Sequence, residues 1–188
     1  MKAFASSFYL ASRMGATYPR LSLEEKIPRF QTREDWDSRK STKVDMCARM
    51  CSHLITRDDA PSMIFEDGKI IFPEVPKPLP GEQISQQLKI VIFEDFASFG
   101  PMVRDVRNVL SASFTLHSNI QRRQVFNLYN IPHLYMDGQA TYAARAKIVK
   151  TFNTDPSIRV LFFTSVGATG LNLTMASVLI FLVRTSNH

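Results

Sequence analysis

A short glycine-containing loop near the end of the chain has the residue types best suited to holding a phosphate or another anionic ligand. Its residues are, in order, Gly167, Ala168, Thr169, Gly170, Leu171 and Asn172. Apolar segments at 160–163 and 178–183 flank the loop, and this order predicts a strand, a loop with a turn, and a second strand. Such a loop would follow the carboxyl end of a buried strand, where open α/β sheets bind their ligands. Glycines let a ligand approach the backbone closely, and the Asn172 side chain offers hydrogen bonds beside it.

Three further segments precede this loop. Lys89–Phe93 is an apolar run that predicts a strand, and Tyr135–Gly138 predicts a strand end followed by an Asp-Gly turn. Thr141–Asn153 predicts a capped helix, which ends in Phe-Asn. Together with Gly170–Ala176, which reads Gly-Leu-Asn-Leu-Thr-Met-Ala and resembles motif V, these segments resemble the second RecA-like lobe of SWI/SNF-type ATPases within the superfamily 2 helicases.

The resemblance implies an α/β fold, a RecA-like and mostly parallel sheet flanked by helices, as in the second lobe of P-loop NTPases. We expect this helicase C-terminal domain to cover residues 41–183, after an interlobe or linker segment at 1–40. A hairpin with a proline-rich excursion is expected at 57–88, and residues 184–188 are interpreted as a truncated tail. Residues 107–124 break the family pattern and have no sustained period, so we interpret them as intron read-through or a recent insertion.

Local patterns predict the first elements of the chain. The charged segment 24–40 predicts a linker that packs Trp36, the single tryptophan, on a core. A helix is predicted at about 42–56 because apolar residues recur there at helical spacing, with Ser41 or Thr42 as its cap.

The Asp67-Gly68 pair stands between two apolar runs, which is the strongest short-range signal for a β-hairpin. Four prolines within residues 73–80 then prevent regular structure. We interpret this excursion as a tolerated surface insertion in preference to a binding element. Ser98 predicts the start of another helix, with Pro101 in its first turn.

The resemblance also implies which residues take part in binding. Gly170 and Asn172 resemble positions that approach the nucleotide ribose or the catalytic water network. The candidates for contact with nucleic acid or with the partner lobe are Asp137, Gly138, Arg145, Gly167, Ala168 and Thr169. On the predicted helix, Arg145, Lys147 and Lys150 are expected to face outward, where they would follow a nucleic-acid backbone or simply be solvated.

The catalytic apparatus of the resembled enzymes is incomplete in this sequence. The chain contains no G-x-x-x-x-G-K-[ST] phosphate loop and no Asp-Glu-x-His-like acidic box, and it ends before the arginine-finger motif would occur. No catalytic residue is therefore assigned, and the chain alone is not expected to turn over ATP. ATP and Mg²⁺ are expected only in an intact two-lobe parent, and whether this chain is itself an enzyme stays open.

Composition sets broader bounds. The chain has 188 residues, of which 45% are hydrophobic, and this predicts a globular domain. The net charge of +6 permits but does not require nucleic-acid binding. Cys47 and Cys51 lie one helical turn apart with no second ligand pair, so buried thiols are favoured over a metal site and a reducing compartment is expected. The apolar patch Ala3–Ala11 is too short and too rich in serine to span a membrane.

Three functions remain distinct at this point. The first is the C-terminal lobe of a DNA-dependent ATPase, with DNA and an N-terminal RecA-like lobe as partners, a role in chromatin remodelling and a nuclear location, cytosol being the default otherwise. The second is a non-catalytic module that docks to DNA or to protein. The third, an unrelated Rossmann-type protein, predicts a G-x-G-x-x-G motif, and the sequence contains none.

Overall fold

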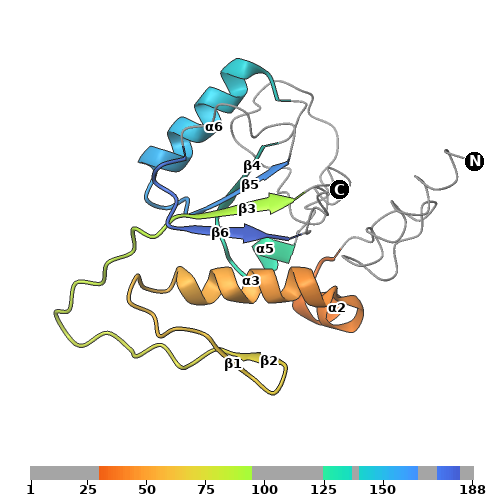
Figure 1. Ribbon diagram of the computed structural model, residues 1–188, viewed down its shortest axis with the longest axis vertical. Coiled ribbons are helices and arrows are strands. Elements are labelled where there is room, and N and C mark those ends of the chain that lie inside the picture. Colours follow the sequence, from red (N-terminus) through yellow and green to blue (C-terminus); the bar gives the residue numbers. More distant parts are fainter. Residues whose placement is uncertain (1–29, 95–124, 137–139, 165–172, 183–188) are drawn as a thin grey trace, which may run out of the picture.

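The central element is a four-stranded sheet. A computed structural model describes residues 30–94, 125–136, 140–164 and 173–182. The strands are β3 (Ile90–Glu94), β4 (His133–Met136), β5 (Val160–Thr164) and β6 (Val178–Phe181), in the order β4-β5-β3-β6 (Figure 1). All three neighbouring pairs are parallel, so the four strands point the same way and their carboxyl ends meet at one edge.

Burial explains why these segments form strands. Every residue of β4 and β5 is buried, as are four of the five residues of β3, because parallel strands are covered on both faces. β6 is an edge strand in which Val178 and Ile180 pack against the core while Leu179 and Phe181 are exposed. The apolar runs that predict these strands are therefore the runs that the helices cover.

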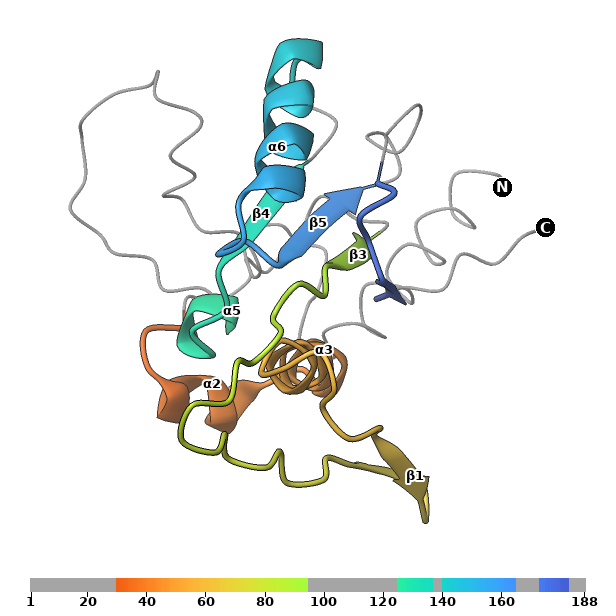
Figure 2. The same ribbon diagram turned by 90° about the vertical axis from the view of Figure 1, so that its left-hand side faces the viewer.

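Helices lie on both faces of the sheet (Figure 2). One face packs against α6 (Tyr142–Thr154) through the buried Ile148 and Phe152. The other face packs against α3 (Thr42–Leu54) and α5 (Val125–Leu128). Right-handed crossovers require this arrangement, because the connection from β3 to β4 and the one from β4 to β5 run in opposite directions across the sheet. The RecA-like α/β fold is confirmed.

The caps of the two long helices follow the sequence. The Ser41 hydroxyl accepts a hydrogen bond from the Val44 amide at 3.4 Å, and the Thr141 hydroxyl accepts one from the Ala144 amide at 3.3 Å. Each such cap stabilises its helix by about 1 kcal/mol. The predicted helices after residues 41 and 141 are thus confirmed, the first ending at Leu54 and the second at Thr154.

A short helix, α2 (Arg33–Arg39), occupies the segment for which the sequence predicts a linker. Trp36 is fully buried, contacts Phe30 edge-on with ring centroids 4.8 Å apart, and donates its indole N–H to Asp45 at 3.0 Å. The predicted packing of Trp36 on a core is confirmed. The domain bounds remain a prediction, but Phe30 and Trp36 belong to the main hydrophobic core, so the packed body includes residues before position 41.

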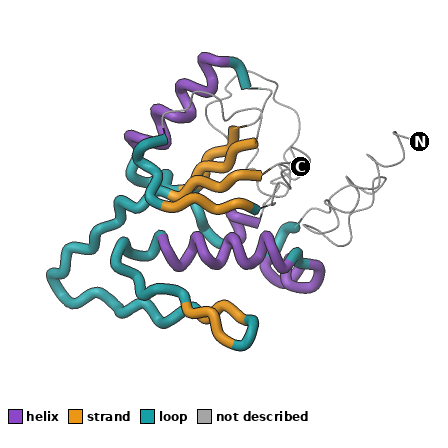
Figure 3. Tube along the Cα trace, viewed as in Figure 1, coloured by secondary structure: helices purple, strands orange, loops and turns teal. Residues whose placement is uncertain are grey.

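The excursion at 57–88 contains the predicted hairpin, formed by β1 (Ile64–Glu66) and β2 (Lys69–Ile71). Asp67 and Gly68 have φ angles of 48° and 70°, which is the pattern of a two-residue turn with positive φ at both central positions. The hairpin lies on the far side of α3 from the sheet, and an extended loop returns from it to β3 (Figure 3).

Asp58 links this excursion to the amino-terminal edge of the sheet through hydrogen bonds and an ion pair. Its carboxylate accepts hydrogen bonds from the backbone amides of Gln87 and Leu88, both at 2.8 Å, and forms an ion pair with the buried Arg159 at 2.9 Å. Arg159 stands immediately before β5, so one carboxylate joins the start and the end of the excursion to the central sheet.

Several predictions fall on segments whose structure is not described. The helix predicted from Ser98, the segment 107–124 and the tail 184–188 lie outside the described residues. In the part of the chain that the structure describes, no helix has both the length and the apolar character needed to cross a bilayer.

Candidate functional site

The carboxyl edge of the sheet is where the predicted site residues attach. β3 and β5 end in register at Glu94 and Thr164, and β4 ends beside them at Met136. Asp137 and Gly138 directly follow Met136, and the glycine loop begins at Gly167, three positions after Thr164. Open α/β sheets bind ligands at the edge where these three strands end.

Most of the predicted site residues themselves fall in segments whose structure is not described. These are Asp137, Gly138, Gly167, Ala168, Thr169, Gly170 and Asn172, and their roles stay predictions. The chain is described again from Leu173, which packs with Ala176 against the core between the sheet and α6. The residues from Leu173 to the start of β6 therefore lie on the α6 face of the sheet.

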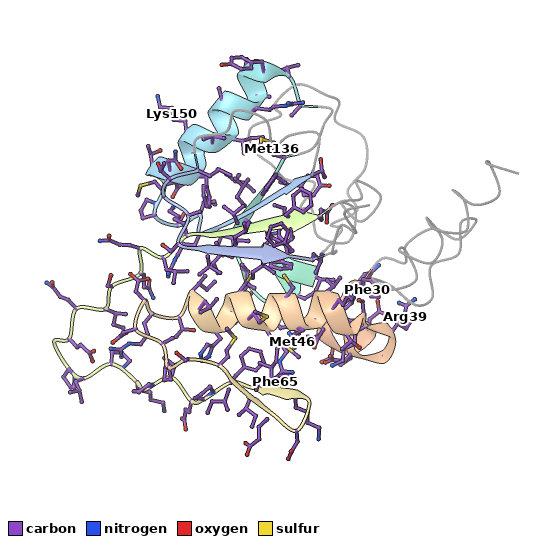
Figure 4. The ribbon with its side chains drawn as sticks, in the orientation of Figure 1. Phe30, Arg39, Met46, Phe65, Met136 and Lys150 are labelled. Carbon is purple, nitrogen blue, oxygen red and sulfur yellow. The ribbon has the colours of Figure 1, made fainter. Side chains whose placement is uncertain are left out.

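Arg145 is the predicted contact residue that the structure describes. Its side chain is half-buried, and its Nε donates a hydrogen bond to the Ala140 carbonyl at 2.9 Å. The expectation that it faces fully outward is therefore wrong in part, because the guanidinium folds back over the start of α6. Lys147 and Lys150 are exposed as predicted, and Lys150 projects from the outer side of the helix (Figure 4).

Glu94 is a polar residue of this edge that the sequence interpretation missed. Its side chain has no exposed surface, and the Tyr135 hydroxyl donates a hydrogen bond to its Oε1 at 2.8 Å. Among the described residues its Oε2 has no hydrogen-bond partner, and neither has the buried hydroxyl of Thr164 on the next strand. In the sequence, Glu94 is an acidic residue at the end of an apolar run. Such a residue normally indicates a solvated strand end, so the sequence gives no sign of its burial.

Burial determines the protonation of Glu94. It raises the pKa of the carboxyl group to about 8, although the hydrogen bond from Tyr135 acts in the opposite direction. At neutral pH the group is therefore mainly a neutral acid, which both donates and accepts hydrogen bonds. A neutral acid and a hydroxyl on adjacent strand ends offer hydrogen bonds to a ligand or loop, and they carry no charge.

Two basic side chains at the opposite edge of the sheet have structural partners. Arg159 donates to the carbonyls of Leu88 at 2.9 Å and Ile55 at 2.6 Å, in addition to its ion pair with Asp58. Lys89 donates to the carbonyls of Asp155 at 2.7 Å and Ile158 at 2.6 Å. Part of the positive charge of the chain is thus engaged in folding and does not serve as a free anion site.

The two cysteines are buried free thiols on α3, as predicted. A hydrogen bond with Cys47, together with burial, raises the pKa of Cys51 well above its usual value, so this thiol stays protonated at neutral pH. Among the described residues, no three His, Cys, Asp or Glu side chains are grouped closely enough to hold a metal ion.

The sequence of the chain matches a known family of helicase domains. A family profile described as the helicase conserved C-terminal domain matches residues 82–188, more than half of the chain. Over 67 residues the chain is 46% identical to the TATA-binding protein-associated factor mot1 of Aspergillus fumigatus, a match that covers 34% of the chain and 4% of the relative.

Two further relatives carry the same kind of name. Over 57 residues the chain is 42% identical to the TATA-binding protein-associated factor BTAF1 of Arabidopsis thaliana and 44% identical to the TATA-binding protein-associated factor 172 of Homo sapiens. Each match covers 30% of the chain and 3% of the relative. The chain thus spans only a small part of the length of the relatives that it matches.

Proposed function

Because the chain belongs to the family of helicase conserved C-terminal domains, we propose that it supplies the second RecA-like lobe of a SWI/SNF-type, ATP-dependent motor that moves along duplex DNA. The observation that carries this proposal is the shared carboxyl edge at which β3, β4 and β5 end. Two of these ends lead into the predicted site segments. A nucleotide held on a first lobe would meet this lobe along that edge.

In this proposal the chain is one half of a nucleotide site. Gly170 and Asn172 would approach the ribose or the water network of an ATP whose magnesium and phosphates are held mainly by an N-terminal RecA-like lobe. When bound, ATP would supply the γ-phosphoryl group that is transferred to water, and Mg²⁺ would neutralise charge on the phosphates. The buried Glu94 and Thr164 of this edge fit a half-site, since an acid that is mainly neutral and a hydroxyl offer hydrogen bonds and no strong charge.

DNA is the proposed second partner. Lys147 and Lys150 are exposed on α6, which begins at the same carboxyl edge. Exposed lysines that neutralise phosphates make binding salt-dependent and insensitive to sequence. The names of the relatives, which are TATA-binding protein-associated factors, support a nuclear location and a parent that acts on DNA in transcription or chromatin remodelling.

Phosphate release tests the half-site. The chain alone is expected to show no turnover of Mg-ATP, with or without duplex DNA. A separately prepared N-terminal RecA-like lobe from a SWI/SNF-type protein is expected to bind a fluorescent ATP analogue more tightly when this chain is added, while turnover stays low because the sequence contains no arginine-finger motif. Robust turnover by the chain alone would contradict the proposal, because the sequence has no phosphate loop.

Fluorescence anisotropy with a labelled duplex tests the DNA surface. Replacing Lys147 and Lys150 with alanine is expected to weaken binding uniformly and to reduce the salt slope by about one unit for each phosphate that is no longer neutralised. The matched control replaces Lys69 and Lys77, two exposed lysines of the excursion, and should bind like the wild type. DNA binding with no effect on the nucleotide affinity of a first lobe would favour the second candidate, a non-catalytic docking module.

A further inference from the structure

Glu94 has a combination of properties that packing alone does not account for. It is completely buried, it accepts one hydrogen bond from Tyr135, and its second oxygen has no partner in the part of the chain that the structure describes. Leaving a buried polar atom without a partner costs about 1–3 kcal/mol. An alanine or a valine at this position would avoid that cost, so the carboxyl group calls for a functional explanation.

Residues from three strands lie near Glu94 at the carboxyl edge of the sheet. Glu94 closes β3, Tyr135 stands near the end of β4, and Thr164 closes β5 as the register partner of Glu94. In parallel strands, register partners project to the same face, so the free oxygen of Glu94 and the hydroxyl of Thr164 share one side of the sheet. The segments that follow β4 and β5 are the ones that carry the predicted site residues.

We propose that Glu94 is a positioning residue which, in its neutral form, ties the ends of β3 and β4 together beside the end of β5 and thereby sets the geometry of the ligand edge, and that its ionisation releases this edge. The neutral acid accepts from Tyr135 and has a proton of its own to donate, to Thr164 or to a ligand. The ionised form loses that donor. The proposal rests on the proposed function only in taking this edge to be the one that binds ligand.

The described surroundings of Glu94 do not offset a charge on its carboxyl group. Among the described residues, the ionisable groups on this face of the sheet are Tyr135 and His133 on β4, Tyr129 just after α5, and Asp45, Cys47, Cys51 and His53 on α3. Of these, Tyr135 donates a hydrogen bond to Glu94, and among the described residues no cation and no backbone amide acts on the carboxyl group in the same way. Ionisation therefore has to bring in water or a cation, and either would separate the strand ends.

Hydrogen exchange on the full chain tests this role directly. Peptides that cover 90–94, 133–136 and 160–164 are followed by mass spectrometry from pH 6 to pH 9, with exchange times scaled to the intrinsic rate at each pH. Protection in the wild type is expected to fall by about tenfold per pH unit up to about pH 8 and to level off above it, because the carboxyl group ionises near 4.5 when exposed and near 8 when buried. Glu94→Gln keeps a neutral hydrogen-bonding group and should hold its protection across the range. Glu66→Gln, in the exposed hairpin, should follow the wild type.

Tyr135→Phe is a second variant, for which the direction of the change in the pKa of Glu94 is known. The hydroxyl of Tyr135 lowers the pKa of Glu94 in the folded chain, so with Tyr135→Phe the loss of protection should continue to a higher pH before it levels off. A wild type whose protection is constant from pH 6 to pH 9, or a Glu94→Gln chain that loses protection as the wild type does, would overturn the proposal. Tyr135→Phe decides the question if the glutamine variant does not fold.

Binding of a labelled DNA duplex at pH 6.5 and pH 9, at one ionic strength, connects the switch to ligand. The wild type should weaken more than Glu94→Gln between the two pH values, and equal weakening would count against the positioning role. Absence of DNA binding at both pH values would overturn the proposed DNA contact and leave the exchange result to decide the role of Glu94. The two proposals therefore fail in distinguishable ways.

Discussion

Replacement of Asp58 with alanine is expected to destabilise the whole domain, although Asp58 lies in an excursion that the sequence suggests is dispensable. The Asp58 carboxylate accepts four hydrogen bonds, from the Ser85 hydroxyl, the Gln87 and Leu88 amides and the Arg159 guanidinium. Removing it leaves the buried guanidinium of Arg159 without its counter-ion. The substitution thus removes an anchor and creates an unpaired buried charge.

The size of the effect follows from these contacts. Breaking a buried ion pair by removing one partner costs about 3–5 kcal/mol. Arg159 retains its bonds to the carbonyls of Leu88 and Ile55, and the Asp58 side chain is 25% exposed, so we expect about 2–4 kcal/mol. Asp59→Ala is the matched control, because Asp59 is 70% exposed and exposed pairs contribute at most about 1 kcal/mol.

Urea unfolding followed by tryptophan fluorescence measures this difference. Trp36 is the single tryptophan of the chain and is fully buried in the main core, so its emission reports on the core and not on the excursion. The midpoint should fall for Asp58→Ala with little change in slope. A loss below about 1 kcal/mol, or an equal loss for Asp59→Ala, would refute the anchoring argument.

The pH dependence of the free energy of unfolding tests the role of Asp58 independently. Burial alone would raise the pKa of Asp58, but its hydrogen bonds with Ser85, Gln87 and Leu88 and the charge of Arg159 hold it below the usual 3.8. A carboxyl group whose folded pKa is depressed contributes stability that is present above its unfolded pKa and is lost as the pH falls through the folded value. The difference between the wild type and Asp58→Ala should therefore shrink as the pH falls below 3.8.

Two other regions give further predictions. The pKa of Glu94 is raised from 4.5 to about 8, so the wild type should lose stability relative to Glu94→Gln as the pH rises from 4.5 to 8, by about 3 kcal/mol at pH 7. Urea unfolding at several pH values measures the free energy of unfolding of both chains. The same pH dependence in the wild type and in Glu94→Gln would contradict this prediction. The buried thiols of Cys47 and Cys51 should react with a thiol reagent at least about a hundredfold more slowly in the native protein than in urea, and similar rates would show that α3 is not packed as described.

The sheet was predictable because its strands are short apolar runs that helices cover on both sides. The segments beginning at residues 90, 133, 160 and 178 lie in one sheet as predicted, and the two long helices begin after the predicted caps Ser41 and Thr141. These features depend on local composition and on period, which a single sequence carries. The identification as a helicase C-terminal domain is confirmed by the family match.

Features that depend on distant partners could not be predicted. The ion pair of Asp58 with Arg159 joins residues 101 positions apart, and no local pattern signals it. The short helix α2 has a charged sequence typical of a linker, and it is ordered by tertiary packing of Trp36 against Asp45. Glu94 has the sequence context of a solvated strand end, and its burial depends on neighbouring strands.

The two edges of the sheet use polar groups in opposite ways, and this difference bears on how the net charge of +6 should be interpreted. At the amino-terminal edge, Arg159 and Lys89 satisfy backbone carbonyls that would otherwise be buried without partners, so these cations stabilise the fold. At the carboxyl edge, Glu94 and Thr164 have atoms that no described residue pairs with, despite the cost. A protein tolerates such unpaired atoms where a ligand or a moving segment completes the bonds. The net charge of +6 is therefore not by itself evidence for a ligand site, because part of it stabilises the fold.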